Sequence, residues 1–389
     1  MMDGGLNPNP QYLIPTLTFA FCAFRFALLV LRSPLSLALA AMSGYNCFMY
    51  DVIAIGSTTI DSFWKTDFEL TDYKKAPSGK AISIPFGEKY GVEDVVFTLG
   101  GNAANASVTF ARQGFRTALF TKIGRDSLGA EVKRRLEAEK VSESLIEYSK
   151  DKSTSFSVLL LQKGERSILT HHGAINGFTL KNVNLSRLKS RFWYVSLPGE
   201  SYREFDRLLE YAVKNKIGVA LNPSYRQLVG SGRAKLLKHL KNIDFLVVND
   251  GEAASLAGIP FARHKEVFKK LDELVPGIVA VTAGPKGVMV SDGEVVYCAG
   301  VFPEKKIADR TGAGDAFGSG FLAGLLARGW DGRKKTGAET VEYAIRLASA
   351  NATSVVEKIG ATPGVLTKRE FKTSPRWSKR KIETNKVNY

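Results

Sequence analysis

Residues 307–328 read IADRTGAGDAFGSGFLAGLLAR, a loop rich in Gly, Thr and Asp that runs directly into an apolar segment. Apolar side chains recur in this segment at spacings of three and four residues, which predicts a packed helix. The recurring positions are Phe317, Phe321, Leu322, Leu325 and Leu326. The loop then lies at a helix N-terminus, where the first N–H groups have no intrahelical partner and carry the positive end of the dipole. Because Gly312, Ala313 and Gly314 leave these groups unobstructed, we predict an anion hole.

Asp315 follows, at the point where a bound phosphate would lie. A carboxylate is expected beside a phosphate when a hydroxyl group has to lose its proton there, as it does when it attacks a γ-phosphoryl group. The stretch therefore predicts phosphoryl transfer to an alcohol, with Asp315 as the base. The competing interpretation is that Asp315 only caps the helix after a glycine-rich turn.

The GAGDAF sequence at a loop-to-helix junction resembles a signature of the ribokinase or PfkB family of sugar and nucleoside kinases. Residues 100–124, GGNAANASVTFARQGFRTALFTKIG, are similar to the family's other signature. Two motifs in the right order, about two hundred residues apart, are more specific than either one alone. The second motif matches at Gly100, Gly101, Ala103, Asn105, Ser107, Gly114 and Gly124.

The resemblance covers roughly residues 50–367. It implies a ribokinase-like three-layer α/β/α sandwich with a mostly parallel sheet and a small β-sheet lid. Repeated strand-and-helix units from residue 193 onward independently predict a parallel sheet covered by helices on both faces. The chain contains neither a Walker A sequence nor a dinucleotide-binding GxGxxG after the first strand, which argues against P-loop kinases and dehydrogenases.

Composition is that of an ordinary globular protein, with 389 residues of which 44% are hydrophobic and 24% charged. The three cysteines, at 22, 47 and 298, have no paired spacing, so we expect no disulfide framework and a cytoplasmic protein. Residues 368–389 carry eight Lys or Arg against two Glu, which is +6 of the formal net charge of +16. Such a tail can touch RNA or an acidic membrane, but we expect a solvated, poorly ordered terminus and no nucleic-acid partner.

Residues 1–48 form a hydrophobic N-terminal extension that differs from the rest of the chain. Residues 12–31 have the length of a membrane span, but a proline and Arg25 interrupt them. A signal peptide is the second interpretation, although no Lys or Arg precedes the apolar run. The third is that translation starts at Met42 or Met49 and that the extension is a start-site artefact. We expect no membrane contact unless residues 12–31 are a true anchor, and we place the kinase domain at residues 49–367.

The acceptor side is predicted from the first strand, residues 51–56, and from the second motif. Asp61 lies just past this strand, and ligands of open α/β sheets bind beyond the carboxyl ends of the strands. The resemblance implies that Asp61, Gly101 and Asn105 bind the hydroxyl groups of the substrate. Taken alone, Asp61 is equally well explained as a turn residue. Thr59 stands where ribokinases have Asn, which leaves ribose specificity open.

Two segments, about residues 62–98 and 153–172, have short alternating stretches separated by turn residues. We expect them to form the lid, with a hairpin turn at residues 163–164. Closing such a lid excludes water, which would otherwise accept the phosphoryl group. Arg166 could reach an anionic group of the substrate or the solvent. In relatives the lid often pairs between two subunits, so a homodimer is expected only by analogy.

The nucleotide-facing residues are predicted at the ends of later strands and on the last long helix. The resemblance assigns nucleotide binding to Asn222, Asn249, Thr282, Gly284, Gly287 and Asn351. Asn249 and Glu252 resemble an Asn-x-x-Glu element that orients Mg²⁺ and phosphate through water, and Mg²⁺ needs few protein carboxylates. An N-capping Asn with a Glu three residues later explains the same pair without a ligand.

Asp309 and Thr311 match positions that bind an activating K⁺ in relatives, but Arg310 places a fixed positive charge between them. Our hypothesis is that Arg310 weakens or replaces the K⁺ requirement, or that it contacts the nucleotide phosphates.

The sequence therefore predicts an ATP- and Mg²⁺-dependent kinase that phosphorylates a sugar hydroxyl group. The first alternative is a nucleoside kinase with the base of the acceptor stacked under the lid. The second, of a different class, is a membrane-tethered nucleotide or sugar sensor, which would have no use for a base at Asp315.

Overall fold

The computed structural model describes residues 50–76, 78–162, 165–332, 336–378 and 381–386. Contacts divide the chain into residues 1–48 and residues 49–389, and every described residue lies in the second unit. The expectations for residues 1–48 and for the turn at 163–164 fall outside the described residues. Within those ranges, none of the helices combines the length and the apolar character that a membrane span requires.

The main sheet has nine strands in the order β17-β16-β15-β14-β13-β12-β11-β1-β6. The six strands from β14 to β6 run parallel, and β15, β16 and β17 are antiparallel additions at one edge. The strands are β1 (Tyr50–Gly56), β6 (Thr117–Phe120), β11 (Ser190–Ser196), β12 (Gly218–Leu221), β13 (Phe245–Asn249), β14 (Ile278–Thr282), β15 (Val288–Ser291), β16 (Val295–Ala299) and β17 (Glu383–Lys386). The central strands are continuous apolar runs because both of their faces are buried.

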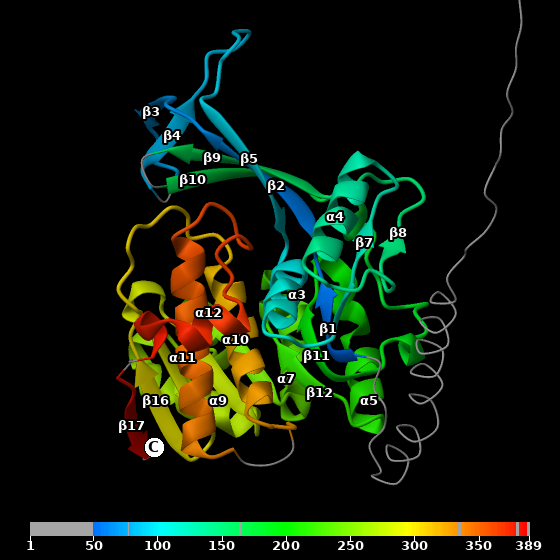
Figure 1. The fold of residues 1–389 in the computed structure, drawn as a ribbon, viewed down its shortest axis with the longest axis vertical. Coiled ribbons are helices and arrows are strands. Elements are labelled where there is room, and N and C mark those ends of the chain that lie inside the picture. The colour runs from blue at the N-terminus through cyan, green and yellow to red at the C-terminus, as the bar shows by residue number, and fades with distance from the viewer. Residues whose placement is uncertain (1–49, 77, 163–164, 333–335, 379–380, 387–389) are drawn as a thin grey trace, which may run out of the picture. The chain divides into compact units, whose positions relative to one another are not determined.

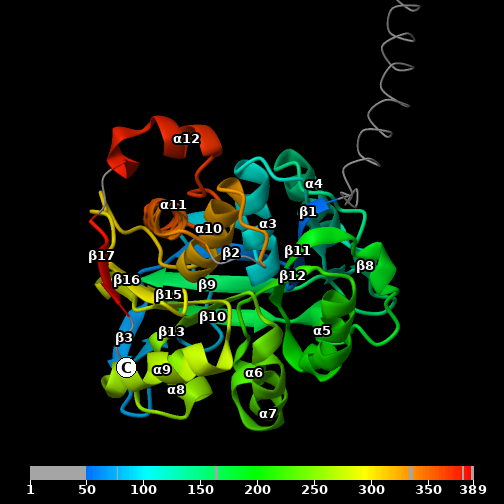
Figure 2. The same cartoon turned by 90° about the horizontal axis from the view of Figure 1, so that it is seen from below.

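Helices cover both faces of this sheet, as Figure 2 shows. One face is packed by α5 (Phe205–Lys214), α7 (Gly230–His239), α8 (Asp250–Ala257) and α9 (His264–Leu274). The other is packed by α3 (Asn102–Arg112), α10 (Ala313–Ala327) and α11 (Ala338–Val356). On the same face as α3, α4 (Ser127–Ala138) buries Val132 and Leu136, and the four-residue helix α6 (Tyr225–Leu228) precedes α7. The three-layer α/β/α sandwich with a mostly parallel sheet is confirmed.

A second sheet forms the lid, in the order β10-β9-β2-β5, and stands away from the main sheet at the top of Figure 1. Its strands are β2 (Thr59–Lys65), β5 (Asp94–Gly100), β9 (Phe156–Gln162) and β10 (Glu165–His171). A small hairpin, β3 (Glu69–Asp72) with β4 (Lys80–Ser83), extends it, and β7 (Lys122–Ile123) pairs with β8 (Glu147–Tyr148) elsewhere. Because β2 leaves β1 after two residues and β5 runs into α3, the lid is joined to the main sheet next to the two predicted acceptor-binding segments.

The described part of the C-terminal tail is folded, unlike the solvated terminus expected from its charge. Thr367 and Glu370 form a capping box that starts α12 (Lys368–Thr373), and β17 pairs with β16. Phe371 and Trp377 are buried, at 8% and 5% exposure, in the core cluster that also contains α10 and α11. Burial of two aromatic side chains outweighs the repulsion of a basic run whose charged ends reach water.

Candidate active site

The N-terminus of α10 has the geometry of the predicted anion hole. Gly312 is its N-cap and has a φ of 78°, in the left-handed region that favours glycine. A Cβ atom at Gly312 would lie 2.3 Å from the Cβ of Ala361. At Gly314, by contrast, a Cβ atom would have nothing within 4 Å. The space in front of the first helical turn is therefore open, and the N–H groups of that turn have no partner within the helix, although that of Ala313 donates to the carbonyl oxygen of Arg310 at 3.4 Å.

Asp315 lies in the first turn of α10, half-buried. Its Oδ2 accepts a hydrogen bond of 2.9 Å from Nδ2 of Asn105, so the two sequence motifs meet at this contact. Burial raises the pKa of the Asp315 carboxyl to about 6; the bond from Asn105 opposes that change, and the charge of Glu252 adds to it. A base with a pKa close to the working pH is well placed to accept a proton.

Asp61 approaches the same space from β2 of the lid and is buried, at 7% exposure. Burial raises the pKa of its carboxyl to about 6; a hydrogen bond with Ser157 lowers it, while the charges of Asp309 and Asp315 raise it further. A Cβ atom at Gly100 would lie 2.0 Å from Oδ2 of Asp61. The Asp61 carboxylate therefore occupies the volume that a side chain at residue 100 would need.

Gly101 has a structural reason to be glycine, because its φ is 90° and a Cβ atom would lie 2.7 Å from the carbonyl oxygen of Ser57. It brings the start of α3 close to the β1–β2 connection, so that Asn105 points at Asp315. The Oδ1 atom of Asn105 is buried, and no hydrogen-bond partner for it lies among the described residues. A buried acceptor of this kind is costly unless a ligand hydroxyl group donates to it.

An apolar cavity of about 240 Å³ adjoins the anion hole, and we call it the α10 cavity. It is lined by Thr282, Gly284, Pro285, Gly287, Val288, Val301, Glu304, Arg310, Ala313, Gly314, Phe317, Ser349, Ala352, Thr353 and Val356. Three of the residues predicted to bind nucleotide, Thr282, Gly284 and Gly287, are among them. From the sequence we did not predict that Val301 and Glu304 line the cavity. Their position within ten residues of Asp309, between β16 and the signature loop, is the signal that could have indicated it.

Asn351 belongs to α11 but does not line the cavity. It is fully buried, and its Nδ2 donates to the carbonyl oxygen of Ala316 at 2.9 Å, while its Oδ1 accepts from the N–H of Leu366 at 2.9 Å. The amide therefore joins α10, α11 and the chain that leads to α12. Its neighbours Ser349, Ala352 and Thr353 face the cavity instead.

Asn222 and Asn249 lie at the carboxyl ends of β12 and β13, outside the lining of the α10 cavity. Nδ2 of Asn222 donates to the carbonyl oxygen of Val247 at 3.2 Å. Asn249 and Glu252 form the capping box of α8, with bonds of 2.8 and 2.9 Å. Asn249 and Glu252 therefore do cap the helix, as the interpretation without a ligand expects.

Glu252 is also close enough to the site to influence it. Burial raises the pKa of its carboxyl, and its charge raises the pKa of Asp315. The described residues contain no group of three or more His, Cys, Asp or Glu that could hold a metal. A metal ion here would therefore be held by Glu252 with water and ligand oxygens, which suits Mg²⁺ and does not suit Zn²⁺.

Asp309 is buried and organises the loop before α10. Its Oδ1 accepts from the N–H and the hydroxyl group of Thr311 at 3.0 and 2.8 Å, and its Oδ2 accepts from the N–H of Gly360 at 3.3 Å. The cation that approaches it is Arg166 from β10 of the lid, with Nη1 3.9 Å from Oδ1. Arg310 is exposed and lines the α10 cavity.

Comparisons with known proteins agree with this fold. Residues 52–368 match the model of the pfkB family of carbohydrate kinases. A ribokinase of Haemophilus influenzae is 27% identical over 300 residues, covering 74% of this chain and 92% of the relative. A cytidine kinase of Thermococcus kodakarensis is 25% identical over 316 residues, covering 80% and 98%. The structure of Arabidopsis thaliana ribokinase with ribose and ATP has the same fold, with a TM-score of 0.66, 20% identity and coverage of 85% and 99%.

Proposed function

The chain belongs to the pfkB family of carbohydrate kinases, and from this premise we propose that its site transfers the γ-phosphoryl group of ATP to a hydroxyl group of a sugar. Members of the family are phosphotransferases with an alcohol group as acceptor, and so is this chain. One observation carries the assignment of the site: Asp315, with a pKa raised to about 6, lies between Asn105 and the open N-terminus of α10.

The nucleotide is proposed to occupy the α10 cavity. Its apolar lining, including Val288, Val301 and Phe317, suits the base, and Arg310 and Gly314 stand where the phosphates would leave the cavity. The exposed guanidinium of Arg310 then contacts phosphate oxygens rather than Asp309. This arrangement would point the γ-phosphoryl group at the first turn of α10 and at Asp315.

The acceptor is proposed to lie between the lid and α3. Asp61 and the unpartnered Oδ1 of Asn105 accept hydrogen bonds from its hydroxyl groups. Asp315 takes the proton of the attacking hydroxyl group, whose oxygen forms a bond to the γ-phosphorus while the bond to the leaving ADP oxygen breaks. N–H groups at the start of α10 stabilise the charge on the transferred oxygens.

Mg²⁺ would be held through water near Glu252, whose carboxylate is half-buried and carries a raised pKa. When bound, it neutralises charge on the phosphate oxygens. For K⁺, Asp309 is the only candidate that we propose among the described residues, and Arg166 already brings a positive charge towards it. We place the reaction in the cytoplasm, which supplies ATP.

A nucleoside acceptor is the second candidate, and the similarity to a cytidine kinase favours it. Of the aromatic side chains on β2, Trp64 lies on the face opposite Asp61, because alternate strand residues point to opposite faces. Phe63 shares the face of Asp61 but is 1% exposed. A base would therefore have to stack on other lid residues, and the choice of acceptor has to be measured.

The function is tested with ATP-dependent phosphorylation of ribose, fructose, 2-keto-3-deoxygluconate, adenosine, cytidine and inosine. Asp315→Asn is the control, because it keeps the shape and removes the base. A sugar phosphorylated by the wild type and not by the variant supports the proposal. A nucleoside as the only acceptor selects the second candidate. ATP binding with no transfer to any acceptor, and no difference between the two proteins, would favour the sensor.

A further inference from the structure

One wall of the α10 cavity is a short connecting segment, residues 301–305, which leads from β16 towards Asp309. Val301 and Glu304 of this segment line the cavity. Phe302 points the other way and is buried, at 2% exposure. A loop with one face on a cavity keeps its position only if something holds its other face.

The C-terminal arm, which we define as residues 367–378 and 381–386, holds that other face. Arg376 of the arm donates from Nη2 to the carbonyl oxygen of Pro303 at 2.6 Å. The same guanidinium makes a two-pronged contact with Glu357, with Nη1 to Oε2 at 2.9 Å and Nη2 to Oε1 at 2.5 Å. Oε1 of Glu357 also accepts from the N–H of Lys305 at 2.6 Å. Arg376 and Glu357 therefore hold the backbone on both sides of Glu304.

Apolar contacts reinforce these bonds. The ring of Trp377 packs edge-on against Phe302, with centroids 5.2 Å apart, and the guanidinium of Arg376 lies 4.2 Å from the Trp377 ring. Strand β17, which also belongs to the arm, pairs with β16, and β16 precedes residues 301–305 in the chain. The connecting segment is thus enclosed between the cavity and the arm.

The same contacts reach the opposite wall of the cavity. Glu357 is the C-cap of α11, and the preceding residue, Val356, lines the cavity. The carbonyl oxygen of Val356 accepts from the N–H of Ala308 at 2.8 Å. Arg376 therefore connects the end of α11 to residues 301–305 through partly buried charge-assisted bonds, which are the stronger kind of hydrogen bond.

We propose that the C-terminal arm is part of the nucleotide-binding apparatus, with Arg376 as a positioning residue that fixes residues 301–305 and the end of α11 around the bound nucleotide. This inference rests on the proposed binding of ATP in the α10 cavity. It adds residues outside the two sequence motifs to the nucleotide-binding apparatus. These residues belong to a basic tail whose composition did not indicate a role in nucleotide binding. Arg376 itself does not line the cavity and acts through Glu357 and Pro303.

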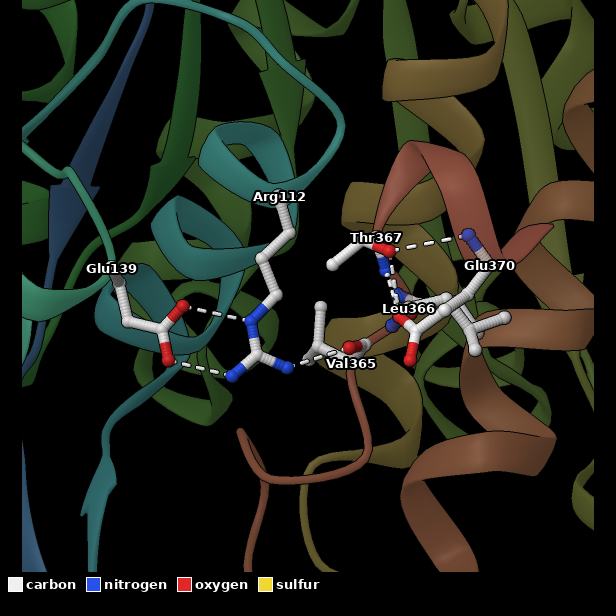
Figure 3. A network of polar contacts seen from close by, with 7 residues as sticks. Arg112, Glu139, Val365, Leu366, Thr367 and Glu370 are labelled. Carbon is white, nitrogen blue, oxygen red and sulfur yellow. Dashed lines mark hydrogen bonds and ion pairs between the residues drawn. The ribbon is translucent and has the colours of Figure 1, made fainter. Parts of the chain in front are cut away.

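The chain contains a matched control at the beginning of the arm, shown in Figure 3. Arg112 of α3 makes a two-pronged contact with Glu139, at 2.7 and 2.6 Å, and donates to the carbonyl oxygen of Val365 at 2.6 Å. Its hydrogen-bond partners are of the same kind as those of Arg376, one glutamate and one backbone carbonyl. Arg112, Glu139 and Val365 do not line the α10 cavity. A purely structural contribution of an anchoring arginine should therefore appear equally in both.

The experiment compares Arg376→Gln with Arg112→Gln in the full chain, by calorimetric titration with ATP, by steady-state kinetics and by thermal unfolding. We expect Arg376→Gln to raise the Kd and KM for ATP roughly tenfold, with kcat and the KM for the acceptor nearly unchanged, because a mobile wall weakens binding and not the chemistry. Arg112→Gln should lower Tm to a similar extent and leave the Kd for ATP within about twofold. Arg376→Lys, which keeps the charge without the fork, should give an intermediate Kd.

Equal ATP affinity in Arg376→Gln and Arg112→Gln, at similar losses of Tm, would overturn the inference and leave the arm a structural element. If Arg376→Gln does not fold, the Lys variant decides, and wild-type affinity in that variant would overturn the inference equally. A wild-type protein that does not bind ATP would instead refute the proposed function. A wild type that binds ATP, with variants that bind it equally well, refutes only the role of the arm.

Discussion

In the proposed mechanism, the ionisation of Asp315 and Asp61 decides whether the site can transfer a phosphoryl group. Burial raises the pKa of both carboxyl groups to about 6, so each is protonated well below that pH and ionised above it. A protonated Asp315 cannot accept the hydroxyl proton, and a protonated Asp61 loses one of its acceptor lone pairs for the substrate.

We predict that kcat/KM of the wild-type enzyme falls as the pH drops through about 6, instead of through the ordinary range near 4. Activity is lost on the acidic side because the active form of each carboxyl group is the ionised one. The loss begins at a higher pH than usual because the pKa is raised. The measurement is a pH–rate profile from pH 4.5 to 9 at constant ionic strength. A profile that stays flat down to pH 4.5 would show that neither carboxylate titrates as proposed.

Two glycines of the signature loop should separate stability from catalysis. At Gly314 a side chain enters open space, so Gly314→Val should leave Tm nearly unchanged but obstruct the phosphate, with a rate loss of roughly 10²–10³. At Gly312, with a φ of 78° and Ala361 only 2.3 Å from an added Cβ, Gly312→Val should lower Tm.

Thermal unfolding and kcat/KM of both variants provide the comparison. A near-normal rate in Gly314→Val would contradict the anion-hole assignment. An unchanged Tm in Gly312→Val would contradict the strained turn at the start of α10.

Among whole elements, β10 matters because it brings Arg166 to the buried Asp309. A guanidinium near this carboxylate supplies part of the charge that a monovalent cation would supply, and removing it leaves the buried carboxylate with its hydrogen bonds from Thr311 and Gly360 but without that positive charge. The Arg310 hypothesis changes accordingly, because Arg310 lines the α10 cavity, where we propose that the nucleotide binds, whereas Arg166 approaches Asp309.

We therefore predict that KCl raises wild-type activity by less than roughly twofold over the same concentration of a large organic cation, and that Arg166→Ala becomes strongly dependent on K⁺. Initial rates at constant ionic strength measure both. A steep K⁺ activation of the wild type, unchanged in Arg166→Ala, would rule out this role for the lid arginine.

The helices and strands that the sequence predicts correctly are those whose formation depends on residues close together in the chain. Periodic apolar residues and glycines at forced backbone positions mark α10 and the start of α3, and uninterrupted apolar runs mark the parallel strands. The arm escaped prediction because its two anchors, Phe371 and Trp377, are six residues apart within a strongly basic run, and their burial depends on a core made by distant segments.

The residues of the candidate site were likewise predictable where a local sequence signal marks them. Asn105 contacts Asp315, and the charge of Asp315 acts on Asp61, so the sequence signals mark residues that lie close together, while their roles stay predictions. Asn351 lies near the cavity, but its side chain forms hydrogen bonds inside the core. The spacing of residues in the sequence does not show in which direction a side chain points. The wall at residues 301–305 and the contact of Gly100 with Asp61 become visible only once the chain is folded.

For the molecule as a whole, the lid leaves an apolar surface exposed. Val95, Phe97 and Leu169 are 39%, 49% and 61% exposed, and the register places them on the lid face opposite Asp61. These side chains lie on β5 and β10, the two edge strands of the lid sheet, and exposed apolar side chains on a sheet are typical of an interface. We propose that a second copy of the chain covers it and that the homodimer forms through the lid.

Light scattering after size exclusion should give twice the monomer mass for the wild type and the monomer mass for Phe97→Asp. Val213→Asp is the control, because Val213 is 57% exposed on α5, away from the lid. A monomeric wild type at micromolar concentration, or a Phe97→Asp protein that remains dimeric, would argue against a lid interface.

The central claim is that the chain is a kinase whose base is Asp315. Its most direct test follows transfer of the labelled γ-phosphoryl group of ATP to the best acceptor, in the wild type and in Asp315→Asn at saturating substrates, with ATP affinity measured in parallel. We expect a rate lower by roughly 10²–10⁴ in the variant, with the Kd for ATP nearly unchanged. Equal rates in the two proteins would contradict the claim.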